Sequence, residues 1–177
     1  MNRRCFVKNT ALTGAMIAGS GLYALGKNNA GVQSGTLFCL RPGCRLPVIG
    51  EVDVLVLGGT AAAVSSAVEA AKNNASVFLV ASYPYLGEDI CGSISLWNDA
   101  SSSSSALARQ LWGNKEFRTP KYIKRSLDQA LIDKNIPFLF NSMPSNILWD
   151  DQGNIAGVII SNRSGEQVIK AKTIIDA

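Results

Sequence analysis

The stretch VDVLVLGGTAAAVSSAVEAAKNNASVFLV at residues 52–80 decides the fold. Residues 52–57 form a valine-rich apolar run, which is typical of a parallel strand buried on both faces. Gly58-Gly59-Thr60 follows, and the small residues at 61–72 predict a helix that ends at Asn73-Asn74. Residues 75–80 supply a second apolar strand. A strand, glycine turn, helix and strand within about 30 residues is the setting of a dinucleotide-binding unit.

The glycine turn has the physical properties that a dinucleotide requires. Gly58 lets the chain bend tightly and brings backbone N–H groups close to a pyrophosphate, while the helix start adds partial positive charge. The G-x-G-x-x-G pattern is only partly met, because Thr60 and Ala63 stand at its second and third glycine positions. Ala81-Ser82 stand where a ribose-binding acid is expected. The motif alone therefore leaves open a Rossmann-like unit without a nucleotide.

The rest of the chain predicts one long helix and several strands. Thr119-Pro120 gives a helix N-cap with proline in the first turn. An apolar stripe follows it, made by Ile123, Leu127, Ala130 and Leu131. Strands are predicted at 136–140, 146–149, 155–160 and 167–170, the last three separated by polar turns, before a final apolar strand from Lys172 to Ala177. The predicted fold class is α/β, with a parallel sheet and an antiparallel β-meander.

Three segments resemble the FAD-dependent oxidoreductases of the glutathione-reductase-like class. They are DVLVLGGTAAAV at 53–64, VFLV at 77–80 and YPYLGED at 83–89. The nearest likeness is to a bacterial branch whose glycine turn often reads Gly-Gly-Thr-Pro-Ala-Gly. The Asp-Ala end of the chain also resembles this family, where the last strand runs on as Ala-Thr-Gly. The resemblance covers residues 51–177, implies a Rossmann-like FAD-binding domain there, and predicts that this domain is incomplete at the C-terminus.

The resemblance implies FAD as cofactor and a set of cofactor-binding residues. In the family, a Leu-Gly-Gly segment after the second strand lies along the flavin side of the pocket, and Leu86-Gly87-Glu88 matches its first two residues. Ala81 replaces the ribose acid, and Ser82 cannot accept two hydrogen bonds as a carboxylate does. No catalytic residue is assigned. The implied cofactor-binding residues are Gly58, Gly59, Thr60, Ala61, Ala62, Ala81, Ser82, Leu86 and Gly87.

Residues 1–27 have the layout of a signal peptide. Arg3, Arg4 and Lys8 precede an apolar run at 11–25, which is short for a membrane-spanning helix. The paired arginines followed by Phe6 resemble a twin-arginine export signal, with an ordinary secretory signal or an uncleaved membrane anchor as alternatives. The twin-arginine route exports folded proteins, which suits an enzyme that collects its cofactor in the cytoplasm. We expect a periplasmic protein with no stable membrane insertion after cleavage, and a linker at residues 28–50.

Composition excludes several kinds of chemistry. Without the four basic residues of the first 27, the chain has 13 basic and 13 acidic residues, so no basic groove for nucleic acid is expected. The sequence has no histidine, which excludes His-based triads and His-ligated zinc. The four cysteines match no zinc spacing, so no metal site is predicted. Cys39 and Cys44 are either a small-loop disulfide or two thiols.

Several other side chains are open to two interpretations. Cys91 would fall near the flavin by resemblance, but a small buried residue is the preferred interpretation. Glu88 and Asp89 are interpreted as acids of a helix N-terminus rather than proton-transfer groups. Trp97 and Trp112 either line a substrate pocket or, by preference, pack in a core or interface. Three basic residues are predicted on a solvated helix face: Lys121, Lys124 and Arg125.

The sequence therefore predicts the FAD-binding, N-terminal portion of an exported FAD-dependent oxidoreductase. By family comparison, a substrate domain for a small molecule and a later segment of the flavin site should follow. We expect the 177 residues alone to catalyse nothing. Two alternatives stay open: a nucleotide-free or NAD-binding α/β interaction module, suggested by Ala81, and a non-functional truncated product.

Overall fold

The computed structural model describes residues 38–41, 44–98, 105–150 and 152–177, and the chain divides after Pro47 into two compact units. The described part of the first unit is an antiparallel hairpin of β1, Phe38–Arg41, and β2, Cys44–Leu46. The predicted linker at 28–50 lies partly outside the described residues, and its described residues form this hairpin and the first residues of the next strand. The predicted signal peptide at 1–27 lies outside the described residues.

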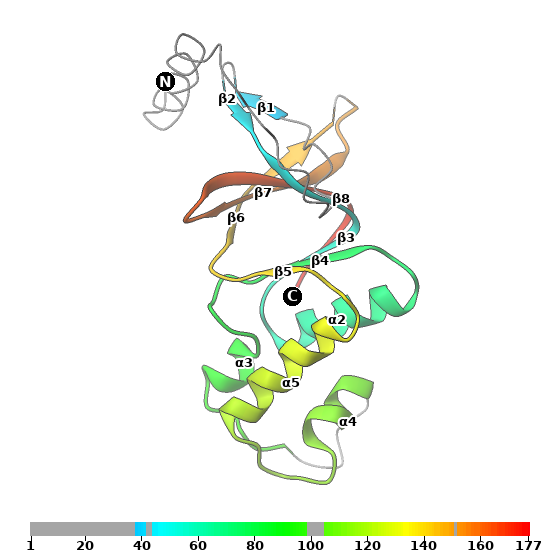
Figure 1. Cartoon of the computed structure of the whole chain (residues 1–177), viewed down its shortest axis with the longest axis vertical. Coiled ribbons are helices and arrows are strands. Elements are labelled where there is room, and N and C mark those ends of the chain that lie inside the picture. The colour runs from blue at the N-terminus through cyan, green and yellow to red at the C-terminus, as the bar shows by residue number, and fades with distance from the viewer. Residues whose placement is uncertain (1–37, 42–43, 99–104, 151) are drawn as a thin grey trace, which may run out of the picture. The chain divides into compact units, whose positions relative to one another are not determined.

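The second unit, Val48–Ala177, is built on one six-stranded sheet in the order β5-β4-β3-β8-β7-β6 (Figure 1). The first four strands are mutually parallel, and β7 and β6 continue the sheet antiparallel. This confirms the predicted α/β, Rossmann-like class with a meander. The strands are β3 Val48–Leu57, β4 Val77–Val80, β5 Phe138–Leu139, β6 Met143–Trp149, β7 Ile155–Asn162 and β8 Gly165–Asp176.

The strand β8 corrects the sequence prediction of two separate strands at its end. It is a single strand of 12 residues that pairs antiparallel with β7 and parallel with β3. The same strand therefore closes the meander and forms the last of the four parallel strands, next to β3. Its partner β3 also starts earlier than predicted, at Val48 rather than Val52, because Val48 and Gly50 already pair with β8.

The helices of this unit begin where the sequence places hydroxyl side chains. Thr60, Ser105 and Thr119 are N-caps, and each hydroxyl accepts a hydrogen bond from the N–H three residues later, at 3.0, 3.0 and 3.4 Å. Such caps satisfy N–H groups that have no partner inside the helix. The predicted helix at 61–72 and the predicted Thr119-Pro120 start are confirmed. The helices are α2 Ala61–Lys72, α3 Glu88–Cys91, α4 Ala106–Trp112 and α5 Pro120–Ile132.

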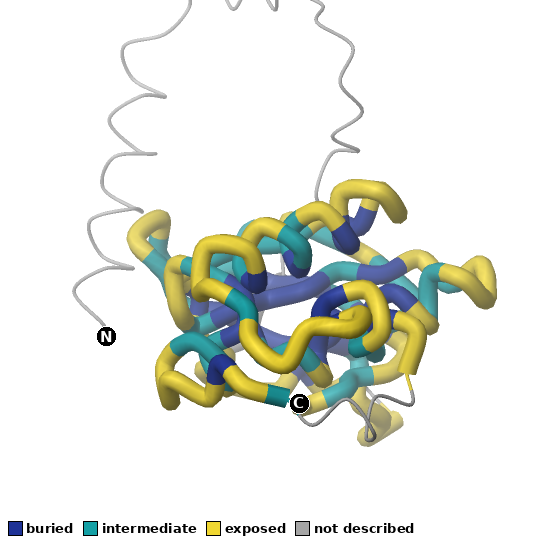
Figure 2. The backbone as a smooth tube through the Cα atoms, turned by 90° about the horizontal axis from the view of Figure 1, so that it is seen from below, coloured by how far each residue is buried: buried dark blue, intermediate teal, exposed yellow. Residues whose placement is uncertain are grey.

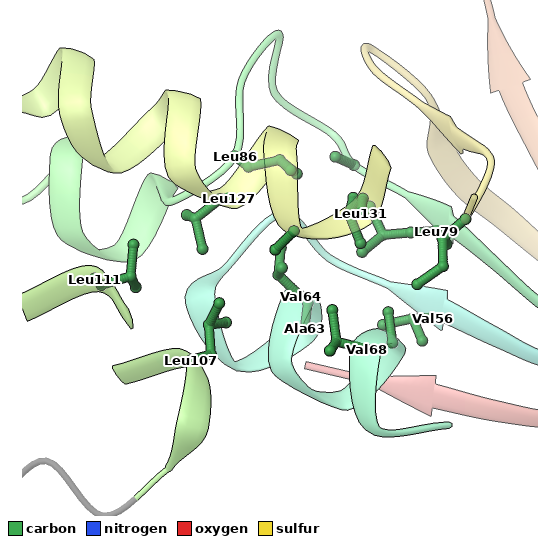
Figure 3. Packing of buried hydrophobic residues seen from close by; sticks show 14 of the residues in the cluster. Val56, Ala63, Val64, Val68, Leu79, Leu86, Leu107, Leu111, Leu127 and Leu131 are labelled. Atoms are coloured by element: carbon green, nitrogen blue, oxygen red, sulfur yellow. The ribbon is translucent and has the colours of Figure 1, made fainter. Parts of the chain in front are cut away.

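The core of this unit lies on both faces of the sheet, because successive residues of a strand point to opposite sides. On one face, Val56 and Leu79 pack against Val64 of α2 and Leu127 and Leu131 of α5 (Figure 3). On the other face, a second cluster contains Leu55, Leu57, Val80, Val158, Ile160, Ile169 and Ala171. Figure 2 shows buried stretches running through the middle of the unit, with exposed turns around them. This packing holds the ends of β3 and β4 in fixed positions.

In the described part of the chain, no helix is both long enough and apolar enough to cross a membrane.

Candidate dinucleotide site

The turn after β3 requires glycine at position 58. Gly58 has φ +131°, a value that residues with a side chain rarely adopt. Its N–H donates to the Val80 carbonyl at 2.8 Å, and the Ala177 N–H donates to the Leu57 carbonyl at 2.9 Å. A Cβ at position 58 would lie 1.8 Å from the Ala177 carbonyl oxygen. The absence of a side chain therefore lets the last strand approach the turn.

The start of α2 is the positively polarised end of this site. Thr60, at the second glycine position of the motif, is the N-cap of α2, and its Oγ1 accepts from the Ala63 N–H at 3.0 Å. Ala63, at the third glycine position, is fully buried against the sheet. The two departures from the glycine pattern therefore support the helix: one caps it and the other keeps it thin. The N-terminal dipole of α2 faces the end of β3 and favours negative charge there.

The segment before α3 returns to this turn. The Gly87 N–H donates to the Gly59 carbonyl at 2.7 Å. Gly87 has φ +78°, and a Cβ there would lie 2.8 Å from Leu127 Cδ1, so glycine is required at this position as well. The Asp89 carboxylate accepts from the Ala61 N–H at 3.1 and 3.3 Å. Two backbone segments 28 residues apart thus meet at the N-terminus of α2.

A second carboxylate, that of Glu88, also lies against the turn. The point that a Cβ on Gly59 would occupy lies 3.5 Å from Glu88 Oε2 and 3.2 Å from the Ala81 Cβ. Glu88 Oε2 is buried and makes no hydrogen bond to any residue that the structure describes. Buried acceptors are normally paired, so an unpaired carboxylate oxygen at a turn of this kind needs an explanation. Sequence reasoning treated Glu88 only as an acid at a helix start, because its contact with Gly59 depends on the fold.

Most of the cofactor-binding residues implied by the resemblance lie at or next to the turn, but their side chains have different surroundings. Gly58, Gly59, Thr60 and Ala81 lie at the ends of β3 and β4, and Ser82 follows β4 and is half-buried. Leu86 is fully buried in the core, so its side chain supports the segment from behind. Ala61 and Ala62 line a separate hollow of about 240 Å³. The other residues of this hollow are Ser65, Ile90, Ser105, Leu107, Ala108, Leu111 and Trp112.

Other predicted side chains fall at the border of the site. Burial raises the pKa of the Cys91 thiol, in line with a packed side chain rather than a reactive one. Lys124 does not simply face solvent as predicted, because its Nζ lies 3.5 Å from the ring centroid of Tyr85. Trp112 is buried in the core, as preferred, whereas Trp97 is 67% exposed and contacts Phe117 at 5.2 Å between ring centroids.

A strand, a glycine turn and a capped helix N-terminus at the carboxyl edge of a parallel sheet define a dinucleotide-binding domain of the Rossmann type. A family model described as FAD dependent oxidoreductase matches residues 53–177. The chain belongs to this family, and FAD is its cofactor, as the sequence predicted. Comparison with curated protein sequences gives no significant match.

Solved structures with the same fold are distant in sequence. A flavocytochrome c3 fumarate reductase matches with a TM-score of 0.54 at 15% identity over 73% of this chain and 34% of the other. A polycyclic ketone monooxygenase from Thermothelomyces thermophila matches with a TM-score of 0.56 at 16% identity. The match covers 72% of this chain and 23% of the monooxygenase. A geranylgeranyl bacteriochlorophyll reductase-like protein from Thermoplasma acidophilum matches with a TM-score of 0.51 at 19% identity. The match covers 72% of this chain and 39% of that protein. The chain thus spans less than two fifths of each of these proteins.

The residues at the turn fit FAD in two respects. The turn at Gly58 and the N-terminus of α2 suit a pyrophosphate, since the glycines leave room for close approach and the helix start carries partial positive charge. The buried, unpaired oxygen of Glu88 suits a hydroxyl donor. One feature competes with the pyrophosphate, because the Asp89 carboxylate already accepts from the Ala61 N–H.

Proposed function

We propose that this chain is the FAD-binding portion of an exported FAD-dependent oxidoreductase. The observation that supports it most is the turn at Gly58, where β3, β4 and the end of β8 meet at the N-terminus of α2. Gly58, Gly59 and Thr60 would hold the pyrophosphate, and Gly87 keeps the following segment against them through its bond to Gly59. When bound, the flavin supplies the electron transfer, and the protein supplies position and electrostatics.

FAD binding by the full chain tests this proposal. Purified chain should turn yellow with FAD, and its melting temperature should rise with FAD concentration. A ligand at about 100 times its Kd adds about 2.7 kcal/mol to the free energy of unfolding. NAD and ADP at matched concentrations serve as comparison ligands. A colourless protein with a melting temperature that FAD leaves unchanged contradicts the proposal.

One observation favours a second candidate, a nucleotide-free or NAD-binding α/β interaction module. Position 81 holds a buried alanine at the end of β4, where a dinucleotide domain has a carboxylate for ribose hydroxyls. This candidate predicts a larger thermal shift with NAD than with FAD, or no shift with either. The same titration series therefore separates the two functions.

We further propose that the 177 residues bind FAD without catalysing oxidation. The chain spans 34% of the flavocytochrome and 23% of the monooxygenase that share its fold, so a small-molecule substrate would contact a further domain. Mixing the FAD-loaded chain with dye acceptors and candidate donors should give no turnover. Substrate-dependent dye reduction by this chain contradicts the proposal.

Export is proposed from the first 27 residues, which resemble a twin-arginine signal and lie outside the described residues. Fused to a reporter that folds in the cytoplasm, residues 1–27 should carry it to the periplasm. Replacing Arg3 and Arg4 together by lysine should abolish export through this route. Export that persists in the double variant indicates the ordinary secretory route instead.

A further inference from the structure

The ribose of a bound dinucleotide needs an acceptor that position 81 does not provide. Two neighbouring hydroxyls of a ribose are best held by one carboxylate, which accepts two hydrogen bonds at once. Ala81 is fully buried and has no polar side-chain atom. If FAD is held at this turn, another side chain has to meet the adenosine ribose.

Glu88 lies beside the same residue of the turn as position 81. The point that a Cβ on Gly59 would occupy is 3.2 Å from the Ala81 Cβ and 3.5 Å from Glu88 Oε2. The main chain next to Glu88 is fixed there, since the neighbouring Gly87 donates to the Gly59 carbonyl at 2.7 Å. This bond keeps the Glu88 carboxylate beside the turn.

The state of the Glu88 oxygen indicates what it binds. Within the described part of the chain, Oε2 is buried from solvent and has no hydrogen-bond partner, whereas the neighbouring Asp89 carboxylate is paired with the Ala61 N–H. An unpaired buried carboxylate oxygen is costly, and a hydroxyl donor from a ligand removes that cost. The two acids thus have separate tasks: Asp89 holds the helix start, and Glu88 offers a free acceptor.

We propose that Glu88 is the ribose-binding carboxylate of this chain and accepts hydrogen bonds from the adenosine ribose of FAD in place of a residue at position 81. The proposal rests on the proposed function, in that FAD must bind at the turn of Gly58 and Gly59. The opposite role for Glu88 is electrostatic repulsion of the pyrophosphate, which predicts an opposite change in affinity.

A binding cycle with two ligands tests this assignment. FAD and an FAD analogue that lacks the 2′-hydroxyl of the adenosine ribose are titrated into the wild-type chain and into Glu88→Gln. Wild type should bind FAD about tenfold to a hundredfold more tightly than the analogue, as expected for hydrogen bonds to a charged acceptor. In Glu88→Gln this difference should fall to within about threefold, because the charged partner is gone. Adding Ala81→Glu to Glu88→Gln should restore much of the preference.

A matched control and a folding check accompany the cycle. Glu69→Gln removes a charge from the exposed face of α2, where Glu69 pairs with Lys72 at 2.7 Å, and should leave the preference unchanged. Unliganded Glu88→Gln should melt at or above the wild-type temperature, since it loses an unpaired buried carboxylate oxygen.

The outcomes separate the inference from the proposed function. Equal preference for FAD in wild type and Glu88→Gln overturns the assignment, and tighter FAD binding by the variant overturns it in favour of repulsion. In both cases the wild-type chain still binds FAD, so the proposed function stands. A wild-type chain that binds neither ligand contradicts the proposed function and the assignment together.

Discussion

Two carboxylates from neighbouring elements, Asp53 of β3 and Glu88 of α3, lie near opposite ends of β4 in opposite states. At the amino end, Asp53 accepts from the Ser76 N–H at 2.9 Å, the Ser76 hydroxyl at 2.6 Å and Lys172 Nζ at 2.6 Å. We refer to these three residues as the amino-end cluster. At the carboxyl end, Glu88 Oε2 is a buried atom near Gly59 without a hydrogen-bond partner among the described residues. Both oxygens of Asp53 are paired, and this oxygen of Glu88 is not.

This contrast separates a structural role from a binding role. The amino-end cluster ties β3, the start of β4 and β8 together, and the Lys172 hydrogen bond holds the pKa of Asp53 well below its usual range. The carboxyl end contains instead a glycine with positive φ, a helix N-terminus and an unpaired acceptor, and this acceptor costs stability unless a ligand pairs with it. Variants at the two ends should therefore change different quantities.

The largest effect is expected from Gly58→Ala at the carboxyl end. The new Cβ would meet the Ala177 carbonyl oxygen, and φ +131° is unfavourable for alanine. We expect a loss of about 3 kcal/mol or more in the free energy of unfolding, together with loss of FAD binding. Urea unfolding and FAD titration measure the two effects.

Gly153→Ala is the matched control for that variant. Gly153 also has a positive φ, +81°, but no atom lies within 4 Å of its Cβ position. Its free energy of unfolding should fall by only about 1 kcal/mol, because alanine disfavours this backbone conformation, and its FAD affinity should equal that of wild type. Equal losses in the two alanine variants would show that the approach of Ala177 to the turn is unimportant.

An intermediate effect is expected from Thr60→Ala. The variant removes the hydroxyl that caps the Ala63 N–H and should reduce the free energy of unfolding by about 1 kcal/mol. Thr60→Ser keeps the hydroxyl and should lie within a few tenths of a kcal/mol of wild type. A Thr60→Ala chain as stable as wild type indicates that α2 does not depend on this cap.

The smallest effect, and a pH-dependent one, is expected from Asp53→Asn at the amino end. Because the folded-state pKa of Asp53 is lowered, its stabilising contribution is present above its ordinary pKa of about 4 and is lost as the pH falls further. The melting temperature of wild type should exceed that of the variant by a few degrees at pH 7. This difference should shrink toward pH 2, and FAD affinity should not change.

Lys172 allows the corresponding test at alkaline pH, where the stabilising contribution is lost as the pH rises rather than as it falls. Its pKa is raised by the hydrogen bond to Asp53, so its contribution persists through neutral pH and disappears only as the pH rises through the raised value. Glu51→Gln, which affects a looser ion pair to Lys170 at 3.7 Å, is the control and should have a smaller effect than Asp53→Asn. A pH-independent difference for Asp53→Asn contradicts the role given to the amino-end cluster.

The parts of the fold that depend on local signals could be predicted from the sequence. The helix at 61–72 was predicted with the correct bounds because Thr60 caps one end and Asn73-Asn74 ends the other. The unbroken strand β8 was missed because the charged residues on both sides of Ala171 suggest a new strand that starts at Lys172. Its charge is accommodated by Asp53, 119 residues away, and such a contact cannot be inferred from neighbouring residues.

The candidate site divides in the same way. The glycine turn at 58–60 and the gap at Ala81 could be recognised from the sequence, because each depends on a residue type at a fixed distance from a strand. The position of Glu88 depends on the αL conformation of Gly87 and on its bond to Gly59, which place a side chain from the next segment over the turn. The contact of Lys124 with the Tyr85 ring was also missed, because it joins two segments that only the fold brings together.

The continuous strand β8 also has a consequence for folding kinetics. It pairs along β3 from Val48↔Val168 to Leu57↔Asp176, so the centre of the sheet joins segments that are far apart in the chain. Contacts of such long sequence separation form slowly, because the entropy of closing the loop is lost before they stabilise the chain. The hairpin of β7 and β8 can form early, whereas the turn at Gly58 is completed only when Ala177 reaches it. Cofactor uptake should therefore follow the last step of folding, and amide hydrogens of β3 should gain protection from exchange later than those of β7.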